Sequence, residues 1–359
     1  MNLHRARRQF LRRSMAGAGG TALLNLLNQD LNGAVALKSA TAAQIPGEKA
    51  RTAKIVSGNL AAAFRDNSYS PRILSGVESL VHSKDAPGFN AFDPDSLGAA
   101  AGLNFEHIIC GHSDPANRFT PRYGRYPMFK LPDQTSVTLV RSQEDCPWVV
   151  SSTLKYTVTP PHYIDLEFRC MAHEAQLFGK RGYAVVFFAN YMNDVAEVPL
   201  HFRGVSGPGA SEEWLAGEAP QSHPDWDRGG TYRHASAEAL SYDENHNFKL
   251  NLWSYDYPRF TQPFWYGRSA HGMMYQVMFD RSFSVQDEIR FSIFKFKLPR
   301  LQRPAWDFQY VIHKVEKSRE YGFRARVVWK AFVSPEDCLG EYQRFQQLMP
   351  IAATSKPAN

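Results

Sequence analysis

The chain has 359 residues, a formal net charge of +6 and 43% hydrophobic residues. This length suits one large all-β domain or two ordinary domains. Five arginines and one aspartate among the first 36 residues contribute +4 of the charge, so the rest of the chain carries only +2. A chain with so little excess charge and no clustered basic arm lacks the electrostatic features of a nucleic-acid-binding protein.

The first 43 residues have the organisation of an export signal followed by a linker. Residues 7–12 read RRQFLR, a short apolar stretch follows at 22–27, and the small residues at 34–36 suit cleavage. The run RRQFLR resembles the bacterial twin-arginine signal, which implies that the twin-arginine translocation machinery exports the folded protein to the periplasm or beyond. Because the apolar stretch is far shorter than the roughly 20 residues that span a bilayer, we expect no transmembrane span in the mature protein. A basic N-terminal arm is the alternative interpretation.

From residue 53 onward apolar residues recur with a period of two, and turn residues recur every ten residues or so. This pattern indicates many antiparallel strands. The predicted strands cover residues 137–140, 153–159, 162–170, 183–192, 248–253, 272–279, 288–298, 308–315 and 321–332. We therefore predict an all-β fold, a large antiparallel β-sandwich over residues 51–332, with no second domain boundary.

Two of these strands predict how the sheets are layered. In residues 162–170, Leu166 and Phe168 share one face while Glu167 and Arg169 share the other, so one face is core and the other polar. Residues 183–192 are apolar on both faces until Asn190, which predicts a strand that is covered on both sides.

The remaining stretches are predicted from turn and capping signals. Residues 204–242 are rich in Gly, Pro, Ser and charge, and we expect a long loop there, either functional or a surface insertion. A helix is predicted over residues 333–349, because Ser334 can cap it, Pro335 fits its first turn and an apolar face can pack on the sheet. We expect residues 350–359 to be disordered.

The densest group of reactive side chains lies at residues 104–114. We predict Glu106 and His107 as catalytic residues and His112 and Arg122 as substrate-binding residues, because carboxylate, imidazole and guanidinium groups serve acid/base chemistry and the binding of hydroxylated or anionic ligands. Strand alternation places Glu106 and His107 on opposite faces. The alternative interpretation is that these side chains are structural.

A second group follows the polar strand. Glu167 and His173 are further catalytic candidates, because a carboxylate on an open sheet can act as acid or base when a neighbour shifts its pKa. Asn190 interrupts the apolar strand and is a substrate-binding candidate. A solvated sheet face is the alternative for the two charged residues.

A third group is aromatic. Residues 253–271 interleave rings with charged side chains, and we predict Tyr257, Arg259, Trp265 and His271 as substrate-binding residues, since such surfaces stack on sugar rings and bind hydroxyl groups. The same composition is typical of a packed corner in a sandwich, and that alternative stays open.

The sequence implies no particular cofactor. The histidines show neither HxH nor HExxH spacing, so no metal ligands are named, although a metal ion held by distant strands stays open. Cysteines 110, 146, 170 and 338 show no zinc spacing, and their pairing is not set by the sequence.

The architecture, together with GLNFEHI at residues 102–108, resembles the supersandwich of galactose mutarotase-like proteins, which include aldose epimerases, polysaccharide lyases and glycoside hydrolases. This resemblance implies a carbohydrate ligand. Our hypothesis is an exported carbohydrate-active enzyme that acts on a glycan or sugar by acid/base chemistry, of the hydrolase, lyase or epimerase type. Two alternatives are a non-catalytic exported protein that binds a glycan or a partner, and a metal-dependent oxidoreductase. The enzyme hypothesis expects the three groups to converge in one cleft.

Overall fold

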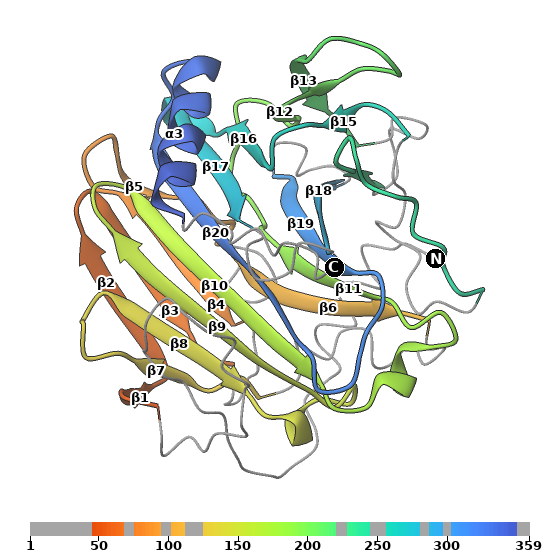
Figure 1. Ribbon diagram of the computed structural model, residues 1–359. Coiled ribbons are helices and arrows are strands. Elements are labelled where there is room, and N and C mark those ends of the chain that lie inside the picture. Colours follow the sequence, from red (N-terminus) through yellow and green to blue (C-terminus); the bar gives the residue numbers. More distant parts are fainter. Residues whose placement is uncertain are drawn as a thin grey trace.

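The computed structural model describes residues 45–67, 75–94, 102–111, 125–219, 228–244, 256–280, 287–296 and 303–349. The predicted export signal, the strand at 248–253 and the C-terminal tail lie outside these ranges. Within them the chain forms three antiparallel sheets (Figure 1). The predicted fold class, an all-β antiparallel sandwich with a helix at its C-terminal end, is confirmed. No helix among the described residues combines the length and the apolar composition that crossing a bilayer requires.

The first sheet is the largest, with eleven strands. In spatial order they are β1 (Glu48–Ala50), β7 (Met128–Lys130), β8 (Ser136–Arg141), β9 (Val150–Thr159), β10 (Tyr163–Ala172), β20 (Glu320–Ala331), β17 (Met273–Asp280), β16 (Phe264–Arg268), β12 (Leu200–Val205) and β13 (Glu213–Gly217), and β15 (Arg259–Phe260) pairs with β12.

The second sheet has five strands and packs against the first. Its order is β14 (Arg228–Tyr232), β18 (Glu288–Lys295), β19 (Ala305–Ile312), β11 (Ala184–Ala189) and β6 (Asn104–Cys110). The third sheet contains β2 (Thr52–Ser57), β3 (Leu60–Arg65), β4 (Gly76–His82) and β5 (Ala86–Asn90). Short 3-10 turns lie at Gln143–Asp145, Ala175–Phe178 and Ala270–Gly272.

The predicted loop at residues 204–242 is wrong in part, because β13 and β14 lie within it. β13 forms a hairpin with β12 at one end of the first sheet, and β14 adds to β18 at one end of the second. Neither segment alternates clearly in sequence. Their strand conformation comes from hydrogen bonding to a neighbouring strand, a tertiary effect that overrides weak local propensity.

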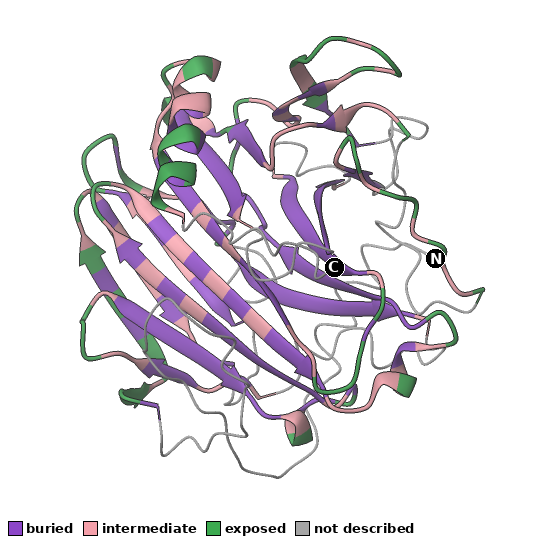
Figure 2. Cartoon of the chain, viewed as in Figure 1, coloured by how far each residue is buried: buried purple, intermediate pink, exposed green. Residues whose placement is uncertain are grey.

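The layering follows the expected burial patterns. Leu166 and Phe168 of β10 are buried, whereas Glu167 and Arg169 are only partly covered (Figure 2). All six residues of β11 are buried, as the sequence predicts for a strand covered on both sides. The first sheet therefore has a core face and a polar face, and β11 lies in the middle of the structure.

An aromatic cluster joins the two large sheets. The ring of Phe188 on β11 stacks on Phe308 with a centroid distance of 4.9 Å and on Phe105 at 5.4 Å. It meets Phe168 of β10 edge-on at 5.2 Å and Phe323 of β20 at 5.4 Å. Both edge-to-face and offset-stacked geometries are favourable for aromatic pairs. This cluster is the centre of the sandwich core.

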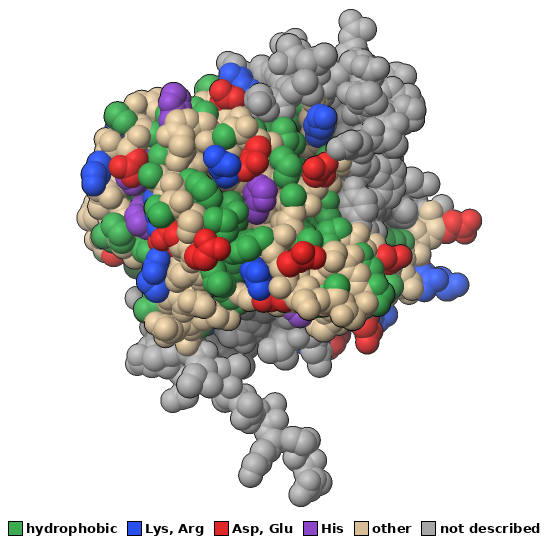
Figure 3. Space-filling view, turned by 90° about the horizontal axis from the view of Figure 1, so that it is seen from above, with side chains coloured by type: hydrophobic (Ala, Val, Ile, Leu, Met, Phe, Trp, Pro, Cys, Tyr) green, Lys and Arg blue, Asp and Glu red, His purple; other side chains and the backbone are tan. Residues whose placement is uncertain are grey.

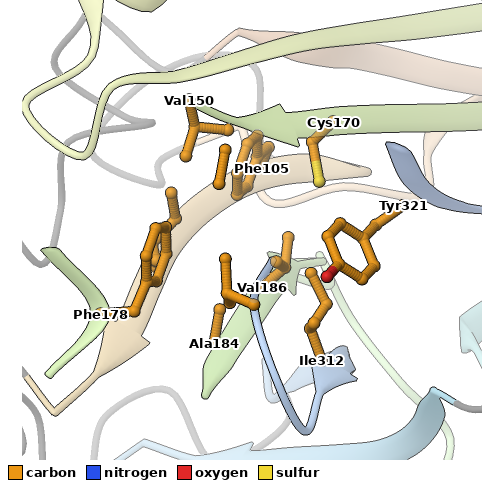
Figure 4. Close-up of a pocket in the computed structure, with 11 residues that line it drawn as sticks. Phe105, Val150, Cys170, Phe178, Ala184, Val186, Ile312 and Tyr321 are labelled. Atoms are coloured by element: carbon orange, nitrogen blue, oxygen red, sulfur yellow. The ribbon is translucent and has the colours of Figure 1, made fainter. Parts of the chain in front are cut away.

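Beside the cluster lies a small cavity of about 10 Å³ between the same sheets (Figure 4). Its wall includes Phe105, Cys170, Phe178, Val186 and Tyr321, which leaves it almost entirely apolar. A space of this size holds one water at most, and an apolar wall gives that water few hydrogen bonds. The cavity is therefore a packing void of the core and no ligand site.

The helix α3 (Pro335–Leu348) packs on the outer side of the first sheet. Its N-cap is the expected one, because Ser334 Oγ accepts a hydrogen bond from the amide of Asp337. Tyr342 and Phe345 then pack against the sheet residues Phe264 and Val328. The cap fixes where the helix begins, and the apolar face fixes which side of it packs on the sheet, as the sequence predicts.

One buried carboxylate also fastens this helix. Glu341 accepts hydrogen bonds from Lys330 Nζ at 2.6 Å, Tyr163 OH at 2.9 Å and Arg344 Nη2 at 2.9 Å, and His162 Nε2 lies 3.5 Å away. Acidic and basic side chains stand side by side on the face that contains the helix (Figure 3). Burial opposes ionisation of Glu341, but the hydrogen bonds outweigh it and hold its pKa well below 4.5.

We expect Glu341→Gln to lower the free energy of unfolding at pH 7 by about 2 kcal/mol, since it removes the charge that these donors share. The pKa of Glu341 is lower in the folded than in the unfolded chain. Its contribution is therefore complete above about pH 4.5 and declines as the pH falls below that value. Urea unfolding of both proteins from pH 7 to pH 3 measures this difference. Glu336→Gln, a change at an exposed position of the same helix, serves as the control. If the difference in unfolding free energy between wild type and Glu341→Gln grows as the pH falls, the stabilising role of ionised Glu341 is contradicted.

Candidate functional site

The second sheet has an apolar face toward the core and a polar face away from it. Opposite residues in antiparallel strands share a face. The register aligns His107, Phe187, Gln309 and Arg290 in one row, and Asp307, Ser292 and Thr231 in the next. We call this outward side the polar face. The six polar side chains of these two rows are at most 1% exposed, so a layer of hydrogen-bonding groups lies buried on a sheet whose other side is core.

A β-bulge decides what β6 contributes to the polar face. Phe188 pairs with Phe105, but Phe187 pairs with His107, so Glu106 is the extra residue on β6. Strict alternation predicts Glu106 and His107 on opposite faces, and that prediction is wrong. The bulge shifts the alternation by one position, so both side chains point to the polar face while Phe105 and Ile108 point to the core.

The bulge brings three proton-carrying groups together. Tyr191 OH donates a 2.6 Å hydrogen bond to Glu106 Oε1, and His107 Nε2 lies 3.7 Å from Glu106 Oε2. Glu106 and His107 are buried, and Tyr191 is nearly so. A carboxyl, an imidazole and a phenol at these distances are groups that can give or take protons on one ligand. We define Glu106, His107 and Tyr191 as the candidate site.

The start of β6 is held by a residue that we predicted to bind substrate. Asn190 Oδ1 accepts from the amide of Leu103 at 2.8 Å and from Tyr275 OH at 3.0 Å, and its Nδ2 donates to the carbonyl of Trp306 at 2.7 Å. Leu103 has a φ of 45°, in the left-handed region that side chains with a Cβ rarely adopt. Asn190 is fully buried with these bonds made, so its expected ligand role is corrected to that of a support for β6.

A fixed ion pair lies farther along the polar face. Arg290 donates to both carboxylate oxygens of Glu288, at 2.8 and 2.9 Å, and to Tyr242 OH at 3.0 Å, while His313 Nε2 lies 3.2 Å from Glu288. Burial favours the neutral form of Glu288, but the hydrogen bonds from His313 and Arg290 outweigh it and lower its pKa. The positive charge of Arg290 is thus neutralised by Glu288 on the polar face.

Part of the cover of the polar face comes from residues 228–244. Leu240 and Tyr242 of this segment pack on Ile109, Val185 and Val311, next to the polar rows. Because the candidate site is buried, a ligand can reach Glu106 only when part of the cover moves.

Two predicted catalytic residues lie on the first sheet instead. Glu167 accepts from Arg169 Nε at 2.7 Å, and Arg169 also binds Glu320. His173 follows β10, where its Nε2 lies 2.9 Å from Ser151 Oγ and burial lowers its pKa. The inward neighbours Phe105 and Phe168 meet across the core at 5.2 Å. Glu106 and Glu167 therefore face away from each other on opposite sides of the sandwich.

The aromatic candidates are also separate. Trp265 is 0% exposed and packs against Tyr275 and Trp306, so it cannot stack on a sugar, and this expectation is corrected. Arg259 donates to the carbonyls of Asp256 and Ala235 and lies over the ring of Tyr257. His271 lies in a turn against Phe89, with ring centroids 4.6 Å apart. The predicted groups therefore lie on different sheets. Glu106 and His107 share the polar face of the second sheet, whereas Glu167, Arg259 and Trp265 belong to strands of the first. His112 and Arg122 lie outside the described residues.

Several members of the polar face escaped the sequence interpretation. The run at residues 287–293 alternates Glu288, Arg290 and Ser292 with apolar residues, and residues 305–312 do the same with Asp307 and Gln309. This period-two signal identifies a polar strand face. What no local pattern shows is that these two strands pair with each other and that β19 also pairs with β11.

Metal and thiol chemistry have limited support within the described ranges. No three His, Cys, Asp or Glu side chains there are grouped so that they could hold a metal ion. Cys146, Cys170 and Cys338 are buried thiols, and burial raises the pKa of Cys338 to about 12. A thiol with so high a pKa is a poor nucleophile near neutral pH.

No protein-family model matches this chain, and no curated protein matches it. Among solved structures, a putative aldose 1-epimerase from Escherichia coli K12 resembles it with a TM-score of 0.45 and 10% identity, over 78% of this chain and 99% of that one. An aldose epimerase homologue from C. elegans gives 0.44 and 12%, over 80% and 100%. A heparinase III gives 0.40 and 7%, over 92% of this chain and 41% of that one. At these values the function has to be inferred from the site itself.

Proposed function

We propose that this protein binds a carbohydrate at the polar face of the second sheet and acts on it by acid/base chemistry at the candidate site. The observation that carries the proposal is the bulge in β6, which turns Glu106 to the same side as His107 and joins it to Tyr191. Bulges are over-represented next to active sites, where they redirect a side chain.

The surrounding groups suit a hydroxylated ligand. The two polar rows contain both donors and acceptors, among them the amide of Gln309 and the hydroxyls of Ser292 and Thr231. Sugar hydroxyls both donate and accept, so they can bind to such a mixed layer of donors and acceptors.

Each residue of the site has a separate part. Glu106 gives or takes the reacting proton, and the phenol of Tyr191 holds its carboxyl group in place through Oε1. The 3.7 Å between Glu106 Oε2 and His107 Nε2 exceeds a hydrogen bond, so the two groups can reach different oxygens of one ligand. Epimerisation of a sugar requires one acid and one base. Hydrolysis of a glycosidic bond usually requires two carboxyl groups.

A substrate panel tests the proposal. We expect the wild-type protein to act on at least one member of a set of simple sugars and of plant, algal and bacterial polysaccharides. The readouts are the rate of anomeric or epimer interconversion by NMR, the release of reducing ends and the absorbance of unsaturated uronates. Glycan binding without turnover on the whole panel contradicts the enzyme and favours the non-catalytic alternative.

A further inference from the structure

Asn104 is the first residue of β6, two positions before Glu106, and it is 0% exposed. It pairs with Ala189, which lies on the same side of β11 as Phe187, so its side chain belongs to the polar face. Within the part of the chain that the structure describes, neither its Oδ1 nor its Nδ2 has a hydrogen-bond partner. The side chain therefore places an unsatisfied acceptor and two unsatisfied donors about 7 Å along the strand from the candidate site.

An unpaired buried amide weakens a fold, because its hydration is lost and nothing replaces it. The chain around Asn104 is nevertheless firmly held. The peptide of the preceding Leu103 donates to Asn190 and accepts from Tyr156 OH at 2.7 Å. A side chain in so fixed a position, with its hydrogen-bonding capacity unused, is suited to a ligand that supplies the missing partners.

We propose that Asn104 binds hydroxyl groups of a neutral sugar and makes the site select neutral sugars over uronates. The inference rests on the proposed function, because it places this sugar beside Glu106 and His107. The Asn104 amide accepts at Oδ1 and donates at Nδ2. Sugar hydroxyls can pair with both atoms, because a hydroxyl oxygen both donates and accepts. A uronate carboxylate placed at Asn104 can only accept, so it pairs with Nδ2 and leaves Oδ1 without a donor.

The charges of the polar face favour the same substrate. The strands β6, β11 and β19 contain no Lys or Arg, whereas Glu106 and Asp307 lie on their outward side. Arg290 on β18 is neutralised by its bidentate pair with Glu288. In a buried site with two carboxyl groups, a negatively charged sugar loses hydration and finds no Lys or Arg on β6, β11 or β19 to offset that loss.

The test compares Asn104→Leu with the wild-type protein. Affinities for glucose against glucuronate, and for galactose against galacturonate, are measured by ligand-observed NMR, together with thermal unfolding. We expect the wild-type protein to prefer the neutral member of a pair, and Asn104→Leu to lose about tenfold in that affinity, the effect of one or two hydrogen bonds. Its melting temperature is expected to stay equal or rise, because an unsatisfied group has been removed.

Thr138→Val is the matched control. Thr138 also carries a buried, unpaired side-chain atom, but it lies on β8 in the first sheet, so its replacement is expected to leave sugar affinity unchanged. A wild-type preference for uronates, or an Asn104→Leu protein that binds the neutral sugar as well as the wild type does, overturns the inference and leaves the proposed function intact. A wild-type protein that binds and converts no sugar overturns both. If the melting temperature of Asn104→Leu falls sharply, Asn104 is a structural residue and the inference fails.

Discussion

Replacing Glu106 by Gln is expected to lower kcat by about 10²- to 10⁴-fold, the usual contribution of a general acid or base. Gln has the shape of Glu and still accepts the hydrogen bond from Tyr191 OH, so the local structure is preserved. It cannot take up or release a proton. Steady-state kinetics on the substrate found in the panel measure the change, and circular dichroism with thermal unfolding verifies the fold.

The matched control is Glu167→Gln. It makes the same chemical change on the outer side of the opposite sheet, where Glu167 is paired with Arg169. We expect its kcat to stay within twofold of the wild-type value, since a partly exposed ion pair contributes little even to stability. Full activity in Glu106→Gln, or a comparable loss in Glu167→Gln, places the chemistry elsewhere.

Phe188→Ala is expected to give the largest loss of stability, about 3–5 kcal/mol in the free energy of unfolding. The ring of Phe188 contacts Phe105, Phe168, Phe308 and Phe323, which come from four different strands of the two large sheets. Its removal leaves a cavity that a β-sandwich cannot close, because the backbones of both sheets are held by hydrogen bonds. Denaturant titration followed by tryptophan fluorescence measures the effect.

Val56→Ala is the comparison for this experiment. Val56 is 67% exposed on β2, so its truncation is expected to change the free energy of unfolding by less than about 0.5 kcal/mol. If Phe188→Ala and Val56→Ala have similar effects, the aromatic cluster is not the centre of the core.

The regular parts of the fold could be predicted because their local pattern and their environment agree. In β10 the alternation of Leu166 and Phe168 with Glu167 and Arg169 matches the two faces of the first sheet. In α3 the cap at Ser334 and the apolar stripe match the surface on which the helix packs. The short strands β13 and β14 escaped prediction, since their conformation depends on the strands beside them.

Of the candidate site, the sequence singles out Glu106 and His107 but neither Tyr191 nor the geometry. Glu106 and His107 stand out in the sequence because two reactive side chains occur in an apolar strand. That they share a face depends on a bulge opposite Phe187, and such a shift is set by pairing with β11. Trp265 was predicted to bind substrate but is buried. The sequence around an aromatic residue does not distinguish a core position from a binding surface.

By itself, then, the sequence determined the β class, the polar and apolar faces of individual strands and the helix at the C-terminal end, because each follows from side-chain periodicity and local capping. Only the tertiary structure decided which polar strand faces meet, where alternation slips by one residue and which reactive side chains are buried together. These features arise from hydrogen bonds and packing between segments far apart in the chain, such as β6 with β11 and β11 with β19, and a local pattern carries no record of them.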